Sequence, residues 1–447
     1  MYLIFLLVAV VGFIVLSTAV LRLHPILALL LAAFGYGILC GRLSLEATVS
    51  AVNAGFGGTI GYIGIVILAG SIIGTFLEKS GGAIRIAESI LAKTGEKNVP
   101  LAIGFVGYVV SIPVFCDSGF VILSPLNRAL TWKAKTTLAS TAIALSLGLY
   151  ATHTMVPPTP GPVAAAGTLD ADLGLVILIG LFVSLFALGA GVVFATRYAS
   201  RIEIDPADEA LLEGEKKKDS ADIPTLSRSL FPILLPIVLI VFRSIAELPA
   251  RPFGEGVFSA TAGFLGQPVV ALLIGVCLAF LLPKKLDREM LSSGGWVGEA
   301  VLAASTIILI TGAGGAFGKV LQESGIADAV KEGFSDAGLG IWLPFLIAAA
   351  LKTVQGSSTV AIITTANIML PLLSVFQLET EIAKALVVVA IGAGSMVVSH
   401  VNDSFFWVVT QLSGMNVRQG YRLQTLGTLF EGTVSIFVIW ILSLFLL

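Results

Sequence analysis

The feature that most constrains this chain is a series of ten apolar runs, each close to the length of a membrane-spanning helix. Crossing a bilayer takes about 20 mainly apolar residues, and only helices and closed barrels satisfy their backbone hydrogen bonds in lipid. The sequence lacks the alternating strands that a barrel requires. Only 12% of its residues are charged and 56% are hydrophobic, whereas soluble domains carry about 25% charged residues. We therefore predict an all-α polytopic membrane protein. The apolar runs lie near residues 3–20, 23–42, 60–78, 136–151, 173–196, 230–247, 266–283, 299–318, 383–400 and 425–446.

Two further apolar stretches are interrupted by small and polar residues. The stretch at about 99–130 breaks at CDSG (116–119), and the stretch at about 341–373 breaks at QGSST (355–359). Each arm is short for a full span. Each stretch is therefore predicted to form a re-entrant helical hairpin.

One polar segment, residues 197–229, divides the chain into two similar halves. It contains EIDPADEALLEGEKKKDSAD, a mixed-charge run typical of a solvated linker. We predict an inverted repeat over 1–196 and a second over 230–447, each with about five transmembrane helices and one hairpin, because an odd number of spans inverts the second copy. Matching positions in the two halves are Ser80 and Ser324, Pro100 and Pro344, Pro125 and Pro371, and His153 and His400.

The distribution of charge predicts the orientation. If the linker is cytoplasmic, most of the 26 lysines and arginines fall in loops on the same side, as the positive-inside rule requires. Both termini are then external, in a multi-pass protein of the cell (inner) membrane. The net charge of −2 gives no reason to expect a nucleic-acid partner, and the three scattered cysteines form no disulfide or metal pattern. We expect no cofactor and no metal.

The hairpin tips are the first candidate binding elements. A helix start leaves about four backbone N–H groups unpaired, and with its positive dipole end it binds a carboxylate without an arginine. The alternative is that small residues only allow helices to pack closely, and that Asp117 only caps the helix that follows it. The candidate residues are Asp117, Ser118 and Gly119 in the first tip and Gly356, Ser357, Ser358 and Thr359 in the second.

Two broken spans supply the second set of candidates. The span at about 136–162 contains four prolines between 157 and 162, which a continuous helix cannot accommodate. The span at about 383–413 contains the polar string SHVNDS. Helices broken at the bilayer midplane are typical of transport sites, although a buried histidine or polar cluster also occurs in a purely structural role. The candidates are Thr152, His153 and Thr159 in the first break and Ser399, His400, Asn402, Asp403 and Ser404 in the second.

Ionisable groups at membrane depth are rarely without function. Histidine titrates near neutral pH, and a carboxylate inside a hairpin is a natural proton acceptor. The candidates for proton coupling are Asp117, His153, His400 and Asp403. Lys352, just before the second tip, has two open interpretations: it neutralises a substrate carboxylate, or it extends its ammonium group to the outer interface.

Four strings resemble the gluconate permease family, the gluconate:proton symporters of the larger ion-transporter superfamily. They are SIPVFCDSGFVILSPL (111–126), HTMVPPTPGPVAAAG (153–167), QGSSTVAIITTA (355–366) and SHVNDSFFW (399–407). The resemblance implies a proton-coupled sugar-acid carrier, a homodimer, and an elevator-type division into scaffold and transport domains. Sodium-coupled relatives tend to carry Ser-Asn-Thr at both tips. This chain has Cys-Asp-Ser-Gly and Gly-Ser-Ser-Thr, which favours protons.

The leading hypothesis is a secondary active transporter for proton-coupled uptake of a small hydroxylated carboxylate, such as gluconate or a related sugar acid. Symport of D-serine, glycerate or another small hydroxy or amino acid is the nearest alternative. An intramembrane hydrolase using His and Asp belongs to a different class, but no nucleophile stands beside a base in the sequence. An anion channel is a third possibility, and gradient-driven accumulation would exclude it.

Overall fold

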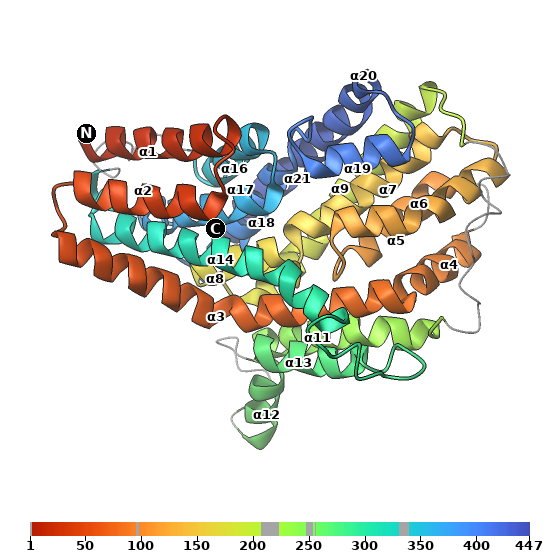
Figure 1. Cartoon of the computed structure of the whole chain (residues 1–447), viewed down its shortest axis with the longest axis horizontal. Coiled ribbons are helices and arrows are strands. Elements are labelled where there is room, and N and C mark those ends of the chain that lie inside the picture. The colour runs from red at the N-terminus through yellow and green to blue at the C-terminus, as the bar shows by residue number, and fades with distance from the viewer. Residues whose placement is uncertain (1, 95–97, 207–222, 247–253, 255, 330–338) are drawn as a thin grey trace.

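The computed structural model describes residues 2–94, 98–206, 223–246, 254, 256–329 and 339–447, and within these ranges it contains helices and no strands. The molecule is elongated, with α1, α2, α3 and α14 side by side at one end and α5, α6 and α7 at the other (Figure 1). The helices of the first half are α1 (Tyr2–Ala19), α2 (Pro25–Leu39), α3 (Leu45–Ser80), α4 (Gly82–Thr94), α5 (Val99–Val110), α6 (Cys116–Lys133), α7 (Leu138–Met155), α8 (Pro160–Leu169), α9 (Leu173–Arg197) and the short η2 (Ala199–Arg201).

The second half repeats the order of a hairpin, a divided helix and a long last helix. Its elements are α11 (Leu226–Ala246), α12 (Val257–Leu265), α13 (Pro268–Ala279), α14 (Trp296–Glu323), α16 (Trp342–Gln355), α17 (Ser358–Met369), η3 (Leu370–Leu372), α18 (Glu381–Met396), α19 (Ser404–Leu412), α20 (Val417–Gly420), the π-helix η4 (Tyr421–Thr425) and α21 (Leu426–Leu446).

Four of the described helices are long and apolar enough to cross a membrane: Leu173–Arg201, Leu226–Ala246, Trp296–Glu323 and Val417–Leu446. Two bent pairs raise the number to six. They are Leu45–Tyr62 with Gly64–Ser80, bent by 43°, and Val257–Leu265 with Pro268–Ala279, bent by 66°. Fewer than ten full-length spanning helices thus correspond to the ten runs in the sequence, because helices such as α2 and α18, with 15 and 16 residues, are shorter than a span.

The helices end and restart where the apolar sequence is interrupted by polar residues, glycine or proline. The hairpin at 99–130 corresponds to α5 and α6, and the hairpin at 341–373 corresponds to α16, α17 and η3. The broken span at 136–162 divides into α7 and α8, and the one at 383–413 into α18 and α19. The linker at 197–229 is described only at its two ends, since residues 207–222 lie outside the described residues.

Local signals explain where these helices begin and end. Pro160 occupies the first turn of α8, where the missing N–H removes no helical hydrogen bond. The side chain of Asp172 accepts a hydrogen bond from the Leu175 N–H and caps α9. Gly81 adopts φ +85°, a left-handed conformation that ends α3 and allows α4 to begin.

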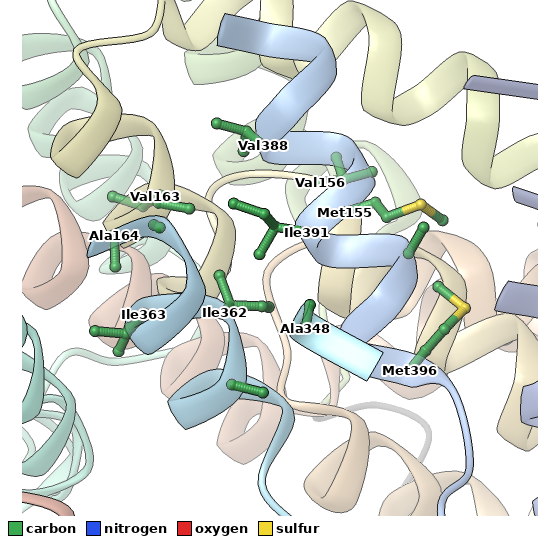
Figure 2. Packing of buried hydrophobic residues seen from close by; sticks show 14 of the residues in the cluster. Met155, Val156, Val163, Ala164, Ala348, Ile362, Ile363, Val388, Ile391 and Met396 are labelled. Atoms are coloured by element: carbon green, nitrogen blue, oxygen red, sulfur yellow. The ribbon is translucent and has the colours of Figure 1, made fainter. Parts of the chain in front are cut away.

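The centre of the molecule is a continuous apolar core between the two halves. Figure 2 shows Val163 and Ala164 of α8 facing Ile362 and Ile363 of α17, with Ile391 of α18 beside them. These side chains are all buried. The core therefore fixes α8, the short helix that follows the first break, against α17 and α18 of the opposite half.

Candidate functional site

The first turns of α6, α17 and α19 gather around a tyrosine on α7. The Tyr150 hydroxyl lies 2.5 Å from the Ser358 hydroxyl in α17. The Tyr150 ring lies 5.1 Å from the ring of Phe405 in α19, which in turn lies 6.2 Å from Phe120 in α6. Three helix starts, two of them from hairpins and one from a helix break, therefore meet at one place.

A buried ion pair joins the second hairpin to the second break. The Lys352 ammonium lies 2.7 Å from Oδ2 of Asp403, and the two side chains are 0% and 5% exposed. Lys352 also donates a hydrogen bond to the Gly356 carbonyl. Because the side chain is fully buried, the hypothesis that Lys352 extends to the outer interface is wrong.

Asp403 is held by two further donors. The Ser399 hydroxyl donates to its Oδ2 at 2.5 Å, and the Phe405 N–H donates to Oδ1 at 3.1 Å, which caps α19. A carboxylate with a cation and two hydrogen bonds is well compensated for its burial. The predicted residues Ser399 and Asp403 thus belong to one network with Lys352.

Asp117 connects the first hairpin to the same break. Its Oδ1 accepts a hydrogen bond from the Ser404 hydroxyl at 3.4 Å, and the Cys116 thiol lies 3.7 Å from Oδ2. The N-cap residue of α6 is Phe115, so the alternative of Asp117 as the N-cap is wrong. Asp117 lies inside the first turn of α6, where the helix dipole favours a negative charge.

We call the seven residues brought together here the central polar cluster. It includes five predicted residues together with Lys352, whose role the sequence left open, and Tyr150, which sequence reasoning missed. The only signal for Tyr150 was a hydroxyl-bearing side chain three residues before His153. The cluster comprises Asp117, Tyr150, Lys352, Ser358, Ser399, Asp403 and Ser404.

His400 and Asn402 bond to the end of α16. Nε2 of His400 lies 2.7 Å from the Thr353 carbonyl oxygen, and Nδ2 of Asn402 donates to the Thr353 and Val354 carbonyls at 3.0 Å each. The last carbonyls of a helix have no partner within it. In this structure the two side chains therefore supply those partners and tie the second break to the second hairpin.

The second hairpin turns on Gly356. Its φ of +81° lies in the left-handed region that favours glycine, and a Cβ there would meet the carbonyl group of Asn402. Ser357 caps α17 by accepting a hydrogen bond from the Val360 N–H at 3.3 Å. Thr359 is half-buried in the first turn of α17.

The first break, between α7 and α8, contributes none of its predicted residues to the central polar cluster. Thr152 and Thr159 donate to the backbone carbonyls of Tyr108 and Val156 at 2.9 and 2.6 Å, so the structure gives both hydroxyls local partners. The His153 ring lies 5.9 Å from Phe115, and its Nδ1 is buried without a hydrogen-bond partner among the described residues. His153 is thus the member of this break that lies against the first hairpin tip.

Two residues of the first tip face neighbouring helices. A Cβ on Gly119 would lie 2.7 Å from the Leu149 side chain, so this glycine allows α6 and α7 to approach closely. Ser118 interacts with the carboxyl group of Glu78 on α3. The packing alternative therefore accounts for Gly119.

A cavity of about 410 Å³ lies away from the cluster, at the C-terminal end of α8. Its described lining residues include Tyr62, Asp170, Asp172, Arg243 and Glu381, and none of them belongs to the central polar cluster. The Lys352–Asp403 pair is buried in this structure, whereas Ser404, another member of the cluster, is exposed.

These features define a class: a multi-pass helical membrane protein with divided helices that meet at a buried polar site. The chain superposes on MtrF of Neisseria gonorrhoeae, one of a class of antimetabolite efflux pumps, with a TM-score of 0.71 over 96% of each chain. It also superposes on the YdaH transporter of Alcanivorax borkumensis, with a TM-score of 0.64 over 95% of this chain and 99% of the other. Both are 15% identical in sequence, so they establish the fold alone.

A model of the GntP family permeases matches residues 1–445. The chain belongs to the GntP family of permeases, which confirms the resemblance of its four strings. It is 33% identical to a gluconate permease of Pseudomonas aeruginosa over 98% of this chain and 97% of the relative. It is 34% identical to the D-serine transporter DsdX of Escherichia coli over 96% of each. An uncharacterized permease of Haemophilus influenzae is 36% identical over 92% of this chain and 85% of that protein.

Proposed function

We propose that this permease is a secondary active transporter of the inner membrane that takes up a small hydroxylated carboxylate, such as gluconate or a related sugar acid, together with protons. The observation that carries the proposal is the Lys352–Asp403 ion pair at the meeting point of three helix starts. A buried ammonium group that is paired internally is available to a competing carboxylate when the pair opens. The substrate carboxylate would replace Asp403 on Lys352.

The surroundings of Lys352 suit an anion that carries hydroxyl groups. The first turns of α6, α17 and α19 present backbone N–H groups and positive dipole ends. Hydroxyls of Tyr150, Ser358 and Ser404 supply both donors and acceptors. A ligand without matching hydroxyls would leave the buried hydroxyls of Tyr150 and Ser358 without a ligand partner, which gives selectivity.

Charge balance favours proton coupling. Asp117 and Asp403 share the cluster with one lysine, and an anionic substrate would add a further negative charge at membrane depth. Uncompensated charge there is costly, and a proton on one carboxyl removes it. Asp117 has no cation of its own in the described structure, so we propose it as the first proton carrier, followed by His153, His400 and Asp403.

We further propose that the two halves are inverted repeats, that the hairpins and divided helices form a mobile elevator-type transport domain, and that the protein is a homodimer. The recurring order of hairpin, divided helix and long last helix supports the repeat. The linker is proposed to be cytoplasmic and both termini external, on the charge argument given above.

D-serine, glycerate or another small hydroxy or amino acid is the second candidate class of substrate. Two carboxylates beside one lysine also suit a zwitterion, whose ammonium group would pair with Asp117 while its carboxylate pairs with Lys352. The relative DsdX is named as a D-serine transporter. Gluconate and D-serine therefore make a discriminating pair of probes.

Purified protein in proteoliposomes tests the proposal. We expect accumulation of radiolabelled gluconate or D-serine driven by an inward proton gradient and abolished by a protonophore. Accumulation driven by sodium alone would overturn proton coupling, and equilibration without accumulation would indicate a channel. Chemical conversion of the probe without a gradient would indicate the hydrolase. A thermal-shift screen with gluconate, glycerate, lactate and D-serine then identifies the ligand, because a ligand stabilises the state that it binds.

A further inference from the structure

The span that ends the chain carries a carboxyl group that the proposed site does not use. Glu431 lies near the middle of the span Val417–Leu446 and is the one ionisable side chain of α21. It is 0% exposed, and neither carboxyl oxygen has a hydrogen-bond partner among the described residues. Its position at membrane depth and its lack of partners make an ionised carboxylate there very unfavourable. In this conformation the group therefore carries its proton.

Among the described residues, the helices packed around Glu431 place no compensating charge or hydrogen-bond donor at its carboxyl group. The Cβ that a side chain at Gly432 would add lies 3.0 Å from the Ala393 carbonyl oxygen, so α18 and α21 pack closely at this level. No ion pair or hydrogen bond in the described structure joins the Glu431 carboxyl to an ionisable group of a neighbouring element. Those groups are Arg197 on α9, Glu381 and Lys384 on α18, Tyr150 and His153 on α7, Lys352 on α16, and Tyr421 and Arg422 on η4.

Glu431 belongs to a buried polar stripe that runs from η4 along one face of α21. Gln424, Thr428, Glu431 and Ser435 follow each other at helical spacing, and all four are 0% exposed. Gln424, Thr428 and Ser435 each have a hydrogen-bond partner, as is usual for polar side chains between packed membrane helices. Glu431 differs from them because neither oxygen of its carboxyl group has a partner among the described residues.

This stripe is bonded to the second helix break. The Ser399 N–H donates to the Thr428 hydroxyl at 3.1 Å, and the Thr425 hydroxyl donates to the Ser399 carbonyl at 2.5 Å. Ser399 in turn donates to Asp403 of the central polar cluster. When the Lys352–Asp403 pair opens and residues 399–403 move, the hydrogen bonds of Ser399 to Thr425 and Thr428 would transmit that movement to the interface between α18 and α21. This interface encloses Glu431.

We infer that Glu431 is a proton-binding residue of the transport cycle. It holds a proton in the conformation described here. It releases that proton when the second break moves and water reaches the carboxyl: the O–H bond breaks, water accepts the proton, and the carboxylate remains until it is reprotonated from the other side. This inference rests on the proposed proton-coupled function.

The test is Glu431→Gln, which keeps the shape of the side chain and removes its titration. In proteoliposomes we expect proton-driven accumulation of gluconate, or of D-serine if the wild type accumulates that probe, to fall at least ten-fold. Exchange of the same probe at equal pH on both sides should stay within two-fold of wild type. The midpoint of thermal unfolding should be unchanged or higher, because a buried carboxyl without partners does not stabilise the fold. Glu379→Gln, at an exposed position before α18, is the matched control and should behave as wild type.

The outcomes separate the inference from the proposed function. A Glu431→Gln variant that still accumulates the probe as the wild type does overturns the inference alone. Loss of exchange as well as accumulation also overturns it, because the residue is then needed for more than proton binding. A wild-type protein that shows no proton-driven accumulation overturns the proposed function, and the inference falls with it.

Discussion

The Lys352 ammonium and the Asp403 carboxylate lie 2.7 Å apart with both side chains buried, and they join the end of α16 to the start of α19. Burying an ion pair of this kind costs free energy because both charges lose their hydration. Removing only one of the two partners destabilises the fold strongly, because the other charge stays buried without a counter-charge. This pair connects two segments that are separated along the chain by α17, η3 and α18. The pair is thus both a structural link and the feature on which anion binding is proposed to depend.

Removing one partner of this pair should be worse than removing both. Lys352→Met leaves Asp403 without its cation and should lower stability by about 3–5 kcal/mol. The double variant Lys352→Met with Asp403→Asn should recover most of that loss, because no unpaired charge remains. Thermal unfolding of the four proteins of the cycle measures the coupling. Losses that simply add would show that the pair is not a unit.

Gly356 should be less tolerant of a side chain than another glycine with a similar backbone. Gly356→Ala combines the strain of a positive φ, about 1–2 kcal/mol, with a contact against the Asn402 carbonyl group. Gly414 has φ +65° and open space around its Cβ position, so Gly414→Ala carries the strain alone. We expect a clearly lower unfolding midpoint and weaker uptake for Gly356→Ala. Equal effects of the two variants would contradict a tight junction between hairpin and break.

The Tyr150 hydroxyl should matter for uptake more than a comparable buried hydroxyl elsewhere. Tyr150→Phe keeps the ring against Phe405 and removes the bond to Ser358, at about 1 kcal/mol. Tyr108→Phe removes the bond to the Leu181 carbonyl at 3.0 Å and the acceptor of the Ser184 hydroxyl at 3.1 Å, both outside the cluster. Tyr108→Phe should therefore lose at least as much stability as Tyr150→Phe, while only Tyr150→Phe raises the KM for uptake. Unchanged KM in Tyr150→Phe would place Tyr150 outside the site.

Asp117→Asn should shift the pH dependence of uptake. The variant keeps an acceptor for the Ser404 hydroxyl but cannot bind or release a proton. Initial uptake rates measured between acidic and neutral pH report the shift, with Glu46→Gln at an exposed position as control. An unchanged profile would assign this titration to another group, His153 being the next candidate.

His400→Ala should abolish uptake with the fold retained. The variant removes the contact with the Thr353 carbonyl, but Asn402 still donates to the same oxygen, so the end of α16 keeps a partner. Uptake assays on protein that elutes as a single species test this. Wild-type uptake would limit His400 to the structural contact seen here.

The sequence predicted the class, a helical membrane protein, and the family from properties that do not depend on tertiary contacts. Apolar runs and low charge are sufficient for a helical membrane protein, because lipid leaves the backbone few alternatives. The prolines at 157–162 and the polar string at 399–404 predicted interruptions, and α7 ends at Met155 while α19 begins only at Ser404. Local sterics and helix capping determine such breaks.

Other features depended on which segments meet in space. The hypothesis that Lys352 reaches the interface was reasonable from its place near a helix end, yet the fold buries it against Asp403. Tyr150 and Glu431 lie in apolar runs in which the sequence predicts only helix. Their importance is visible only in the folded structure, where Ser358 lies beside Tyr150 and the described residues offer the Glu431 carboxyl no hydrogen-bond partner.

The sequence by itself therefore determined that the protein lies in a lipid bilayer, that it is helical, and where its helices break. Each of these follows from hydropathy and backbone chemistry within a few residues. The tertiary structure alone decided which charges are paired and which are left unpaired. Pairing energies in a low-dielectric interior depend on separations of a few ångströms between residues far apart along the chain, and no pattern along a single sequence encodes those distances.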